Sequence, residues 1–120
     1  MYARLTPLLP VHEIRRELAF YEALGFRQHV DAAEVYELED FAALSYGQHI
    51  LFGLVKVAAE VTVPAAGLVW QFEASDLDGV ARAAAVCGLD VVAPVAEQPW
   101  GRRTLAIRSP AGYEVGFEDA

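Results

Sequence analysis

The residues of this 120-residue chain that could act as nucleophiles or metal ligands are few. There are three histidines, His12, His29 and His49, and one cysteine, Cys87. Their spacing forms no Ser/His/Asp or Cys/His arrangement, and neither a CxxC motif nor a GxGxxG loop occurs. Cys87 stands in an alanine-rich stretch, which favours a small buried core residue over a reactive thiol. These residues therefore do not support nucleophilic catalysis.

Carboxylates and aromatic rings are the more plentiful chemical groups. Seventeen acidic residues against nine basic ones give a net charge of −8. This balance argues against nucleic acid and anionic membrane surfaces as partners, because both require a basic footprint. Trp100 lies between Pro99 and Gly101, where no helix or strand face requires a large ring. Its ring is therefore a candidate for a role other than core packing.

The elements that must position these groups begin with an extended segment and a helix. Residues 4–11 contain two prolines, which is typical of an edge strand or a crossing arm. Residues 12–24 have apolar side chains at helical spacing, and Gly25 ends the predicted helix. Short β-like runs follow, with Gly47 in a hairpin turn before the last of them: 26–30, 35–38, 40–46 and 49–55.

The same order of elements begins again after residues 56–66, which have no periodic pattern and indicate a linker. A strand over 67–74 leads into a helix over 77–87, capped by Ser75 or Asp76 and ended by Gly88. Leu68, Trp70 and Phe72 share one face of that strand. Three further strands are predicted: 89–95, 102–109 and 112–118.

Strand–helix–three strands thus occurs twice, at a spacing of about 60 residues. We expect an α+β fold made of two tandem βαβββ modules, residues 1–55 and 67–120, which together form a single domain over 1–120. Each module has too small an apolar surface to be stable alone. The two modules are therefore expected to pair and share their sheets.

Several segments resemble the vicinal-oxygen-chelate superfamily, which includes glyoxalases, extradiol dioxygenases, and fosfomycin and bleomycin resistance proteins. The segment Thr6–Pro10 with the FYEALGF run, and the Asp40-Phe41-Ala42 strand with its hairpin to His49, are similar to the first half of that fold. The EQPWGR and RSPAG stretches, beginning at Glu97 and Arg108, are closest to the bleomycin resistance proteins. The resemblance implies curved mixed sheets around a cleft.

Enzymes of the superfamily hold a divalent metal at four strand positions, which fall here on residues that are not metal ligands: Thr6, Leu51, Val69 and Gly116. The resemblance therefore implies a metal-free binding protein without a cofactor, rather than an enzyme. An alternative stays open. His49 and Glu114 keep strand parity with two of these positions, and a metal displaced onto them would suit a lyase or dioxygenase.

Bleomycin resistance proteins sequester a large cationic drug with a planar heteroaromatic tail without changing it chemically. By resemblance, Trp100 and Phe41 take the stacking role, with Trp70 and Tyr46 as further candidates. The carboxylates expected to supply negative potential are Asp40, Glu73, Glu97 and Glu114. A structural or regulatory module with an empty cleft is the third class of function that the residues leave open.

The resemblance also implies a homodimer with its ligand cleft between subunits. The proline-bearing first strand is similar to the arm that family members exchange between subunits. Because no basic start precedes a long apolar run, and no apolar stretch approaches the ~18 residues of a membrane span, we expect a cytoplasmic protein.

Overall fold

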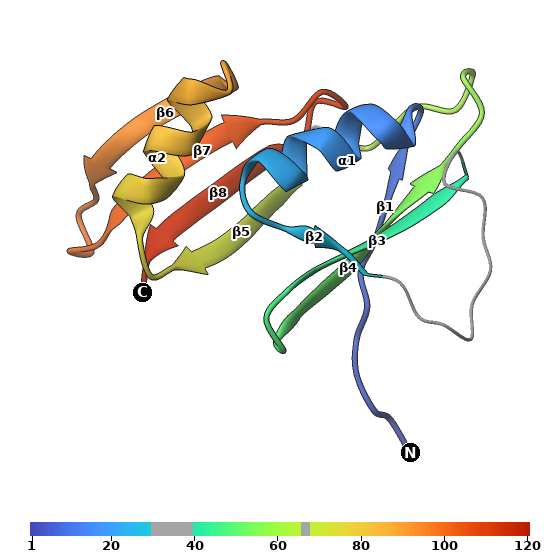
Figure 1. Ribbon diagram of the computed structural model, residues 1–120, viewed down its shortest axis with the longest axis horizontal. Helices are drawn as coiled ribbons and strands as arrows, with labels where there is room; N and C mark the ends of the chain where they lie inside the picture. The colour runs from blue at the N-terminus through green and yellow to red at the C-terminus, as the bar shows by residue number, and fades with distance from the viewer. Residues whose placement is uncertain (30–39, 66–67) are drawn as a thin grey trace. The chain divides into compact units, whose positions relative to one another are not determined.

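The computed structural model describes residues 1–29, 40–65 and 68–120. The chain divides into two compact units, Met1–Val63 and Pro64–Ala120, each with its own sheet, helix and core. In Figure 1 the first unit runs from blue to green and the second from yellow-green to red. The predicted α+β architecture of two βαβββ modules is confirmed. Each unit forms its own four-stranded sheet, and no strand pairing among the described residues joins the two sheets. The expectation that the two modules share their sheets is therefore wrong for the single chain.

Unit 1 contains one helix and a sheet of strand order β1-β4-β3-β2. Strand β1 runs parallel to β4, and the other neighbours are antiparallel. The elements are β1 (Leu8–Val11), α1 (Ile14–Ala23), β2 (Arg27–Gln28), β3 (Phe41–Tyr46) and β4 (Ile50–Lys56). The strand predicted over 4–11 begins only at Leu8, and the strand predicted over 35–38 lies outside the described residues.

Unit 2 repeats this arrangement with strand order β5-β8-β7-β6. Strand β5 is parallel to β8, as β1 is to β4, and the remaining pairs are antiparallel. The elements are β5 (Val69–Ala74), α2 (Leu77–Val86), β6 (Asp90–Glu97), β7 (Arg103–Arg108) and β8 (Glu114–Asp119). The edge strand β6 is irregular, with register shifts on both sides of Ala93.

The repeat has a constant offset of 63 residues, larger than the spacing of about 60 that the sequence pattern indicates. The helices begin at residues 14 and 77, and the glycines that follow them are Gly25 and Gly88, both with positive φ. Strand registers obey the same offset: Ala43 pairs with Gly53, and Ala106 pairs with Gly116. Every residue of unit 1 in these elements can therefore be compared with its counterpart in unit 2.

The core of unit 1 is aromatic. Tyr21 is fully buried and contacts Phe20, Phe26 and Phe52 edge-to-face, with ring centroids 5.0–5.8 Å apart. This T-shaped geometry places the positive edge of one ring on the negative face of the next. The apolar residues Leu44 and Leu54 complete the core from β3 and β4. Helix α1 is therefore fixed to its sheet mainly by large rings.

Helix α2 is alanine-rich and buries only Leu77 and Ala84 completely. The Asp76 side chain accepts a hydrogen bond of 3.0 Å from the backbone N–H of Gly79, so Asp76 is the N-cap. The expectation that Cys87 is a buried core residue is wrong, because its side chain is exposed. Cys87 follows the last helical residue and lies about 60° around the helix axis from Ala84, off the narrow buried stripe.

The counterpart glycines Gly53 and Gly116 lie in different surroundings. A Cβ on Gly53 would stand 2.7 Å from Leu8 Cδ2 and 3.1 Å from Phe41 Cε2. A Cβ on Gly116 would meet nothing nearer than 3.8 Å, where side-chain atoms of Gln71 and Val69 lie. The first glycine is therefore tightly covered by side chains, whereas the second leaves room for a methyl group in ordinary van der Waals contact with Gln71 and Val69.

This difference predicts opposite effects of the same substitution. Gly53→Ala is expected to lower the free energy of unfolding by about 1 kcal/mol, because Leu8 and Phe41 must move. Gly116→Ala is expected to raise it by about 0.5 kcal/mol, because alanine reduces the backbone entropy of the unfolded chain. Urea denaturation followed by circular dichroism measures both. Equal changes in the two variants would contradict the described packing.

Neither helix in the described residues has the length and hydropathy needed to cross a membrane.

Candidate functional site

Each sheet has one face toward its helix and one open face, defined here as the face turned away from the helix. In unit 2, the buried side chains Val115 and Phe117 of β8 face α2. Glu114, Gly116 and Glu118 alternate with them and therefore lie on the open face. Strand pairing extends this face across the neighbouring strands and brings together residues distant in sequence.

The centre of the open face of unit 2 is a row of small residues, called here the small-residue row. Gly116, Ala106 and Ala93 are in register on β8, β7 and β6. Longer and mostly polar side chains from the adjacent registers stand on both sides of this row: Asp90, Arg108, Glu114 and Val69 on one side, and Thr104, Glu118 and Glu73 on the other. A flat ligand group could rest on the row and contact polar groups at its margins.

The carboxylates on this face differ in how far neighbouring side chains neutralise their negative charge. Glu118 accepts a hydrogen bond of 2.9 Å from Gln71 Nε2, and Arg102 Nη1 lies 3.6 Å from Glu118 and 3.9 Å from Glu73. Within the described ranges, Glu114 is half-buried and makes no ion pair. Of the two predicted carboxylates on this face, Glu73 and Glu114, the second therefore keeps more of its negative potential for a ligand.

Trp100 lies at the tip of the β6–β7 hairpin, and its side chain is 64% exposed. Gly101 N–H donates to Gln98 O over 2.9 Å, Gln98 N–H donates to Arg102 O over 2.8 Å, and Gly101 has φ +93°. Pro99 fits the first central position of this turn, and glycine fits its left-handed position. The local sequence therefore presents the tryptophan ring on a well-defined turn, as predicted.

Side chains at the base of this hairpin hold it in place. Gln98 Nε2 donates to Thr104 Oγ1 over 2.9 Å. Arg103 Nε binds Asp119 Oδ2 at 2.8 Å, and its Nη1 binds Asp78 Oδ1 at 3.1 Å, which joins β7 to β8 and to α2. Hydrogen bonds to Asp119 and then to Asp78 raise the pKa of the Arg103 guanidinium above its already high usual value.

The other predicted residues of unit 2 lie at separate places. Trp70 is half-buried on the helix face, where its ring contacts Phe72 edge-to-face at 5.9 Å, so it lies opposite Glu73 and Glu114. Glu97 is exposed at the end of β6 and pairs in register with Arg103 beside the Trp100 hairpin. Glu73 and Glu114 thus share the open face but lie on opposite sides of the small-residue row, Glu97 lies at the base of the Trp100 hairpin, and Trp70 is on the other face.

The predicted residues of unit 1 do not converge either. Phe41 is half-buried on the open face, above Gly53. Tyr46 lies on the helix face of the same strand, 56% exposed, with its ring 5.8 Å from Phe26. Asp40 is exposed immediately before β3. Tyr46 lines a separate hollow of about 560 Å³ together with Gly25, Arg27, Ser45 and Gly47.

The superfamily metal positions lie on or near the open faces. Leu51 is on the open face of unit 1, and Val69 and Gly116 are on that of unit 2, while Thr6 precedes β1. His49 lies in the turn before β4, so the expectation that it keeps strand parity is wrong. Within residues 1–29, 40–65 and 68–120, no three His, Cys, Asp or Glu side chains are grouped so that they could hold a metal ion.

Sequence patterns do not reveal several of the residues on the open face of unit 2: Gln71, Ala93, Arg102, Ala106 and Glu118. Alternation within β8 could have placed Glu118 beside Glu114, because residues two apart share a face. The other residues join the site only through pairing between strands.

Solved structures that match this chain over nearly its whole length establish its fold. TioX from Micromonospora sp. ML1 is 21% identical, with a TM-score of 0.77 and coverage of 98% of each chain. The bleomycin-binding protein of Streptomyces verticillus, solved with copper(II)-bleomycin, is 24% identical, with a TM-score of 0.71 and coverage of 100% of this chain and 99% of that one. The bleomycin resistance determinant encoded on transposon Tn5 is 21% identical, with a TM-score of 0.74 and 98% coverage of each chain.

The chain therefore has the fold of the bleomycin resistance proteins, as the motif resemblance implies. No family model matches it, and no curated protein matches its sequence.

Proposed function

We propose that this protein binds and sequesters a small molecule with a cationic group and a flat aromatic group, without changing it chemically. A bleomycin-type glycopeptide is the ligand class that we infer. The proposal rests on one observation: the Trp100 ring is exposed at the tip of a hairpin that hydrogen bonds hold in place. The structural neighbours named as bleomycin-binding proteins support the same ligand class.

A comparison of free energies shows that stacking on Trp100 alone does not account for micromolar binding. A dissociation constant of 1 µM corresponds to about 8 kcal/mol of binding free energy. One aromatic stack contributes about 0.5–1.5 kcal/mol beyond its buried area. The remaining contacts are proposed to come from the small-residue row with Val69, which is 53% exposed.

Carboxylates supply the proposed attraction for the cationic group. In the part of the chain that the structure describes, Glu97 and Glu114 of unit 2 make no ion pairs. Glu73 lies 3.9 Å from Arg102 and is 72% exposed, so this surface pair neutralises it only weakly. Half-buried Glu114 is proposed as the main contact, because its charge is less screened by water than that of the exposed carboxylates.

The proposed binding form is a homodimer in the cytoplasm. Residues 1–7 leave β1 as an extended tail (Figure 1), and this tail carries the exposed apolar side chains Tyr2 and Leu5. A second copy could cover them, and its β4 could pair with β1 in the same register as the chain's own β4 does. Sedimentation at micromolar concentration is expected to give a dimer, and a monomer at those concentrations would refute this part of the proposal.

The binding proposal can be tested through its two tryptophans. Trp70→Phe leaves Trp100 as the only tryptophan, so emission then reports the proposed contact alone. Adding bleomycin at up to tens of micromolar is expected to quench this emission in a saturable way. A parallel titration with Ni²⁺, Zn²⁺ and Fe²⁺ tests the enzyme alternative, because stoichiometric metal binding abolished in His49→Ala would favour a displaced metal site.

A further inference from the structure

A hollow at one corner of the unit 1 sheet has no place in the proposed drug-binding function. It lies where β2 begins beside the end of β3, and it is called here the corner hollow. Its volume is about 560 Å³, and its lining consists of Gly25, Arg27, Ser45, Tyr46 and Gly47. Small-molecule sites enclose roughly 300–1,000 Å³, so the corner hollow has room for one small ligand.

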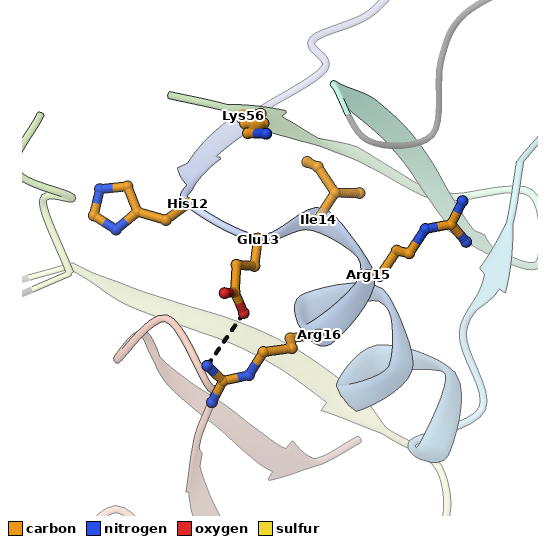
Figure 2. Close-up of a pocket in the computed structure, with 6 residues that line it drawn as sticks. All are labelled: His12, Glu13, Ile14, Arg15, Arg16 and Lys56. Carbon is orange, nitrogen blue, oxygen red and sulfur yellow. Dashed lines mark hydrogen bonds and ion pairs between the residues drawn. The ribbon is translucent and has the colours of Figure 1, made fainter. Parts of the chain in front are cut away.

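Arg27 is the charged residue in the lining of the corner hollow. It is exposed, and within residues 1–29, 40–65 and 68–120 its guanidinium makes neither an ion pair nor a hydrogen bond. Another hollow of unit 1, at the start of α1, differs in this respect, because Glu13 in its lining pairs with Arg16 at 3.2 Å (Figure 2). The lining of the corner hollow includes no carboxylate, so Arg27 is available to an anionic group of a ligand.

The corresponding corner of unit 2 shows the kind of partner that Arg27 lacks. Arg27 and Ser45 are paired in register on β2 and β3, and the pair 63 residues later is Asp90 and Arg108 on β6 and β7. In unit 2 the two side chains have opposite charges and lie 3.9 Å apart. In unit 1 a cation faces the neutral Ser45 instead. The facing strand therefore provides no carboxylate for Arg27.

Tyr46 differs from its counterpart in the same way. Ser109, 63 residues later, is buried, and its Oγ accepts a hydrogen bond of 3.2 Å from the Tyr113 N–H. Tyr46 is mostly exposed, and its ring contacts Phe26 edge-to-face at 5.8 Å, which holds it in place. Unit 1 therefore presents an aromatic ring at the position where unit 2 has a small side chain that is satisfied within the unit.

We propose that the corner hollow binds a small aromatic carboxylate, whose carboxylate pairs with Arg27 and whose ring packs on Tyr46. The arginine fork suits the two oxygens of a carboxylate, and the Ser45 hydroxyl can donate a hydrogen bond to the same group. Because Ser45 and Tyr46 are adjacent in β3, they face opposite sides of the sheet. The ligand must therefore lie across the end of β3, and the long, flexible arginine side chain supplies the reach.

This site goes beyond the proposed function, because it takes an anion, whereas the proposed drug site takes a cation. Its lining belongs wholly to unit 1. Packing on one ring and an ion pair with an exposed arginine each contribute little to affinity, and ordering the arginine side chain opposes binding. We therefore expect a dissociation constant of roughly 1–10 mM.

A titration with benzoate followed by ¹H–¹⁵N NMR at constant ionic strength tests this site. Acetate, which has the anion without the ring, and benzyl alcohol, which has the ring without the charge, are added in separate arms. With benzoate we expect saturable shifts of the backbone amides of the five lining residues, and with the other two compounds at least fivefold weaker binding. Shifts that grow linearly without saturation, or equal binding of acetate or benzyl alcohol, would overturn the proposal.

Matched variants separate the corner hollow from unspecific binding. Arg27→Gln and Tyr46→Leu are each expected to weaken benzoate binding at least threefold, with the circular dichroism spectrum unchanged because both side chains are exposed. Arg82→Gln and Tyr2→Leu remove an exposed guanidinium and an exposed ring from other parts of the chain, and they are expected to leave the affinity unchanged. An unchanged affinity in Arg27→Gln or Tyr46→Leu, or an equal loss in the matched control, would contradict the proposal.

Discussion

Phe52→Ala is expected to lower the free energy of unfolding by about 3–5 kcal/mol, the largest stability effect that this structure predicts. Phe52 is fully buried, and its ring centroid lies 5.0 Å from that of Tyr21 and 5.7 Å from that of Phe26. Alanine would remove both edge-to-face contacts and leave a cavity that the rigid neighbouring rings cannot fill. Domains of this size have a total stability of only about 5–15 kcal/mol, so the loss should be plain in urea denaturation.

The counterpart residue provides a control for Phe52→Ala. Val115 stands 63 residues later and is also fully buried, but it has no ring. Val115→Ala removes two methyl groups and should cost about 2 kcal/mol. If Phe52→Ala were no more destabilising than Val115→Ala, the aromatic cluster would not be the main support of unit 1.

Trp100→Ala is expected to weaken ligand binding at least tenfold, which corresponds to about 1.4 kcal/mol. The ring is 64% exposed, so the substitution should change the free energy of unfolding by no more than about 0.5 kcal/mol. Calorimetric titration with bleomycin measures the affinity, and urea denaturation measures the stability.

A second exposed apolar side chain serves as the control for Trp100→Ala. Val86 is 85% exposed at the end of α2 and takes no part in the proposed site. Val86→Ala should leave the affinity unchanged. An unchanged affinity in Trp100→Ala, or an equal loss in Val86→Ala, would contradict the stacking role of Trp100.

Local signals in the sequence were sufficient for most of the fold. Gly25 and Gly88 each end a helix with positive φ, and the apolar spacing before them identifies the bounds of both helices to within two residues. The exposed position of Trp100 was predictable from Pro99 and Gly101, because the turn needs these residue types at those positions. Cys87 was predicted wrongly, because helical spacing does not show how narrow the buried stripe of α2 is.

The candidate site was less predictable, because it depends on pairing between strands. The small-residue row joins Gly116, Ala106 and Ala93, which are far apart in sequence and adjacent only through strand register. Composition and spacing along one segment do not contain this relation.

The central claim, binding without chemical change, is tested most directly by calorimetric titration of the native protein with bleomycin, followed by mass spectrometry of the recovered ligand. The proposed function predicts saturable binding with a dissociation constant below about 10 µM, and a ligand recovered at unchanged mass. The absence of saturable heat at tens of micromolar, or a ligand altered in mass after incubation, would contradict it.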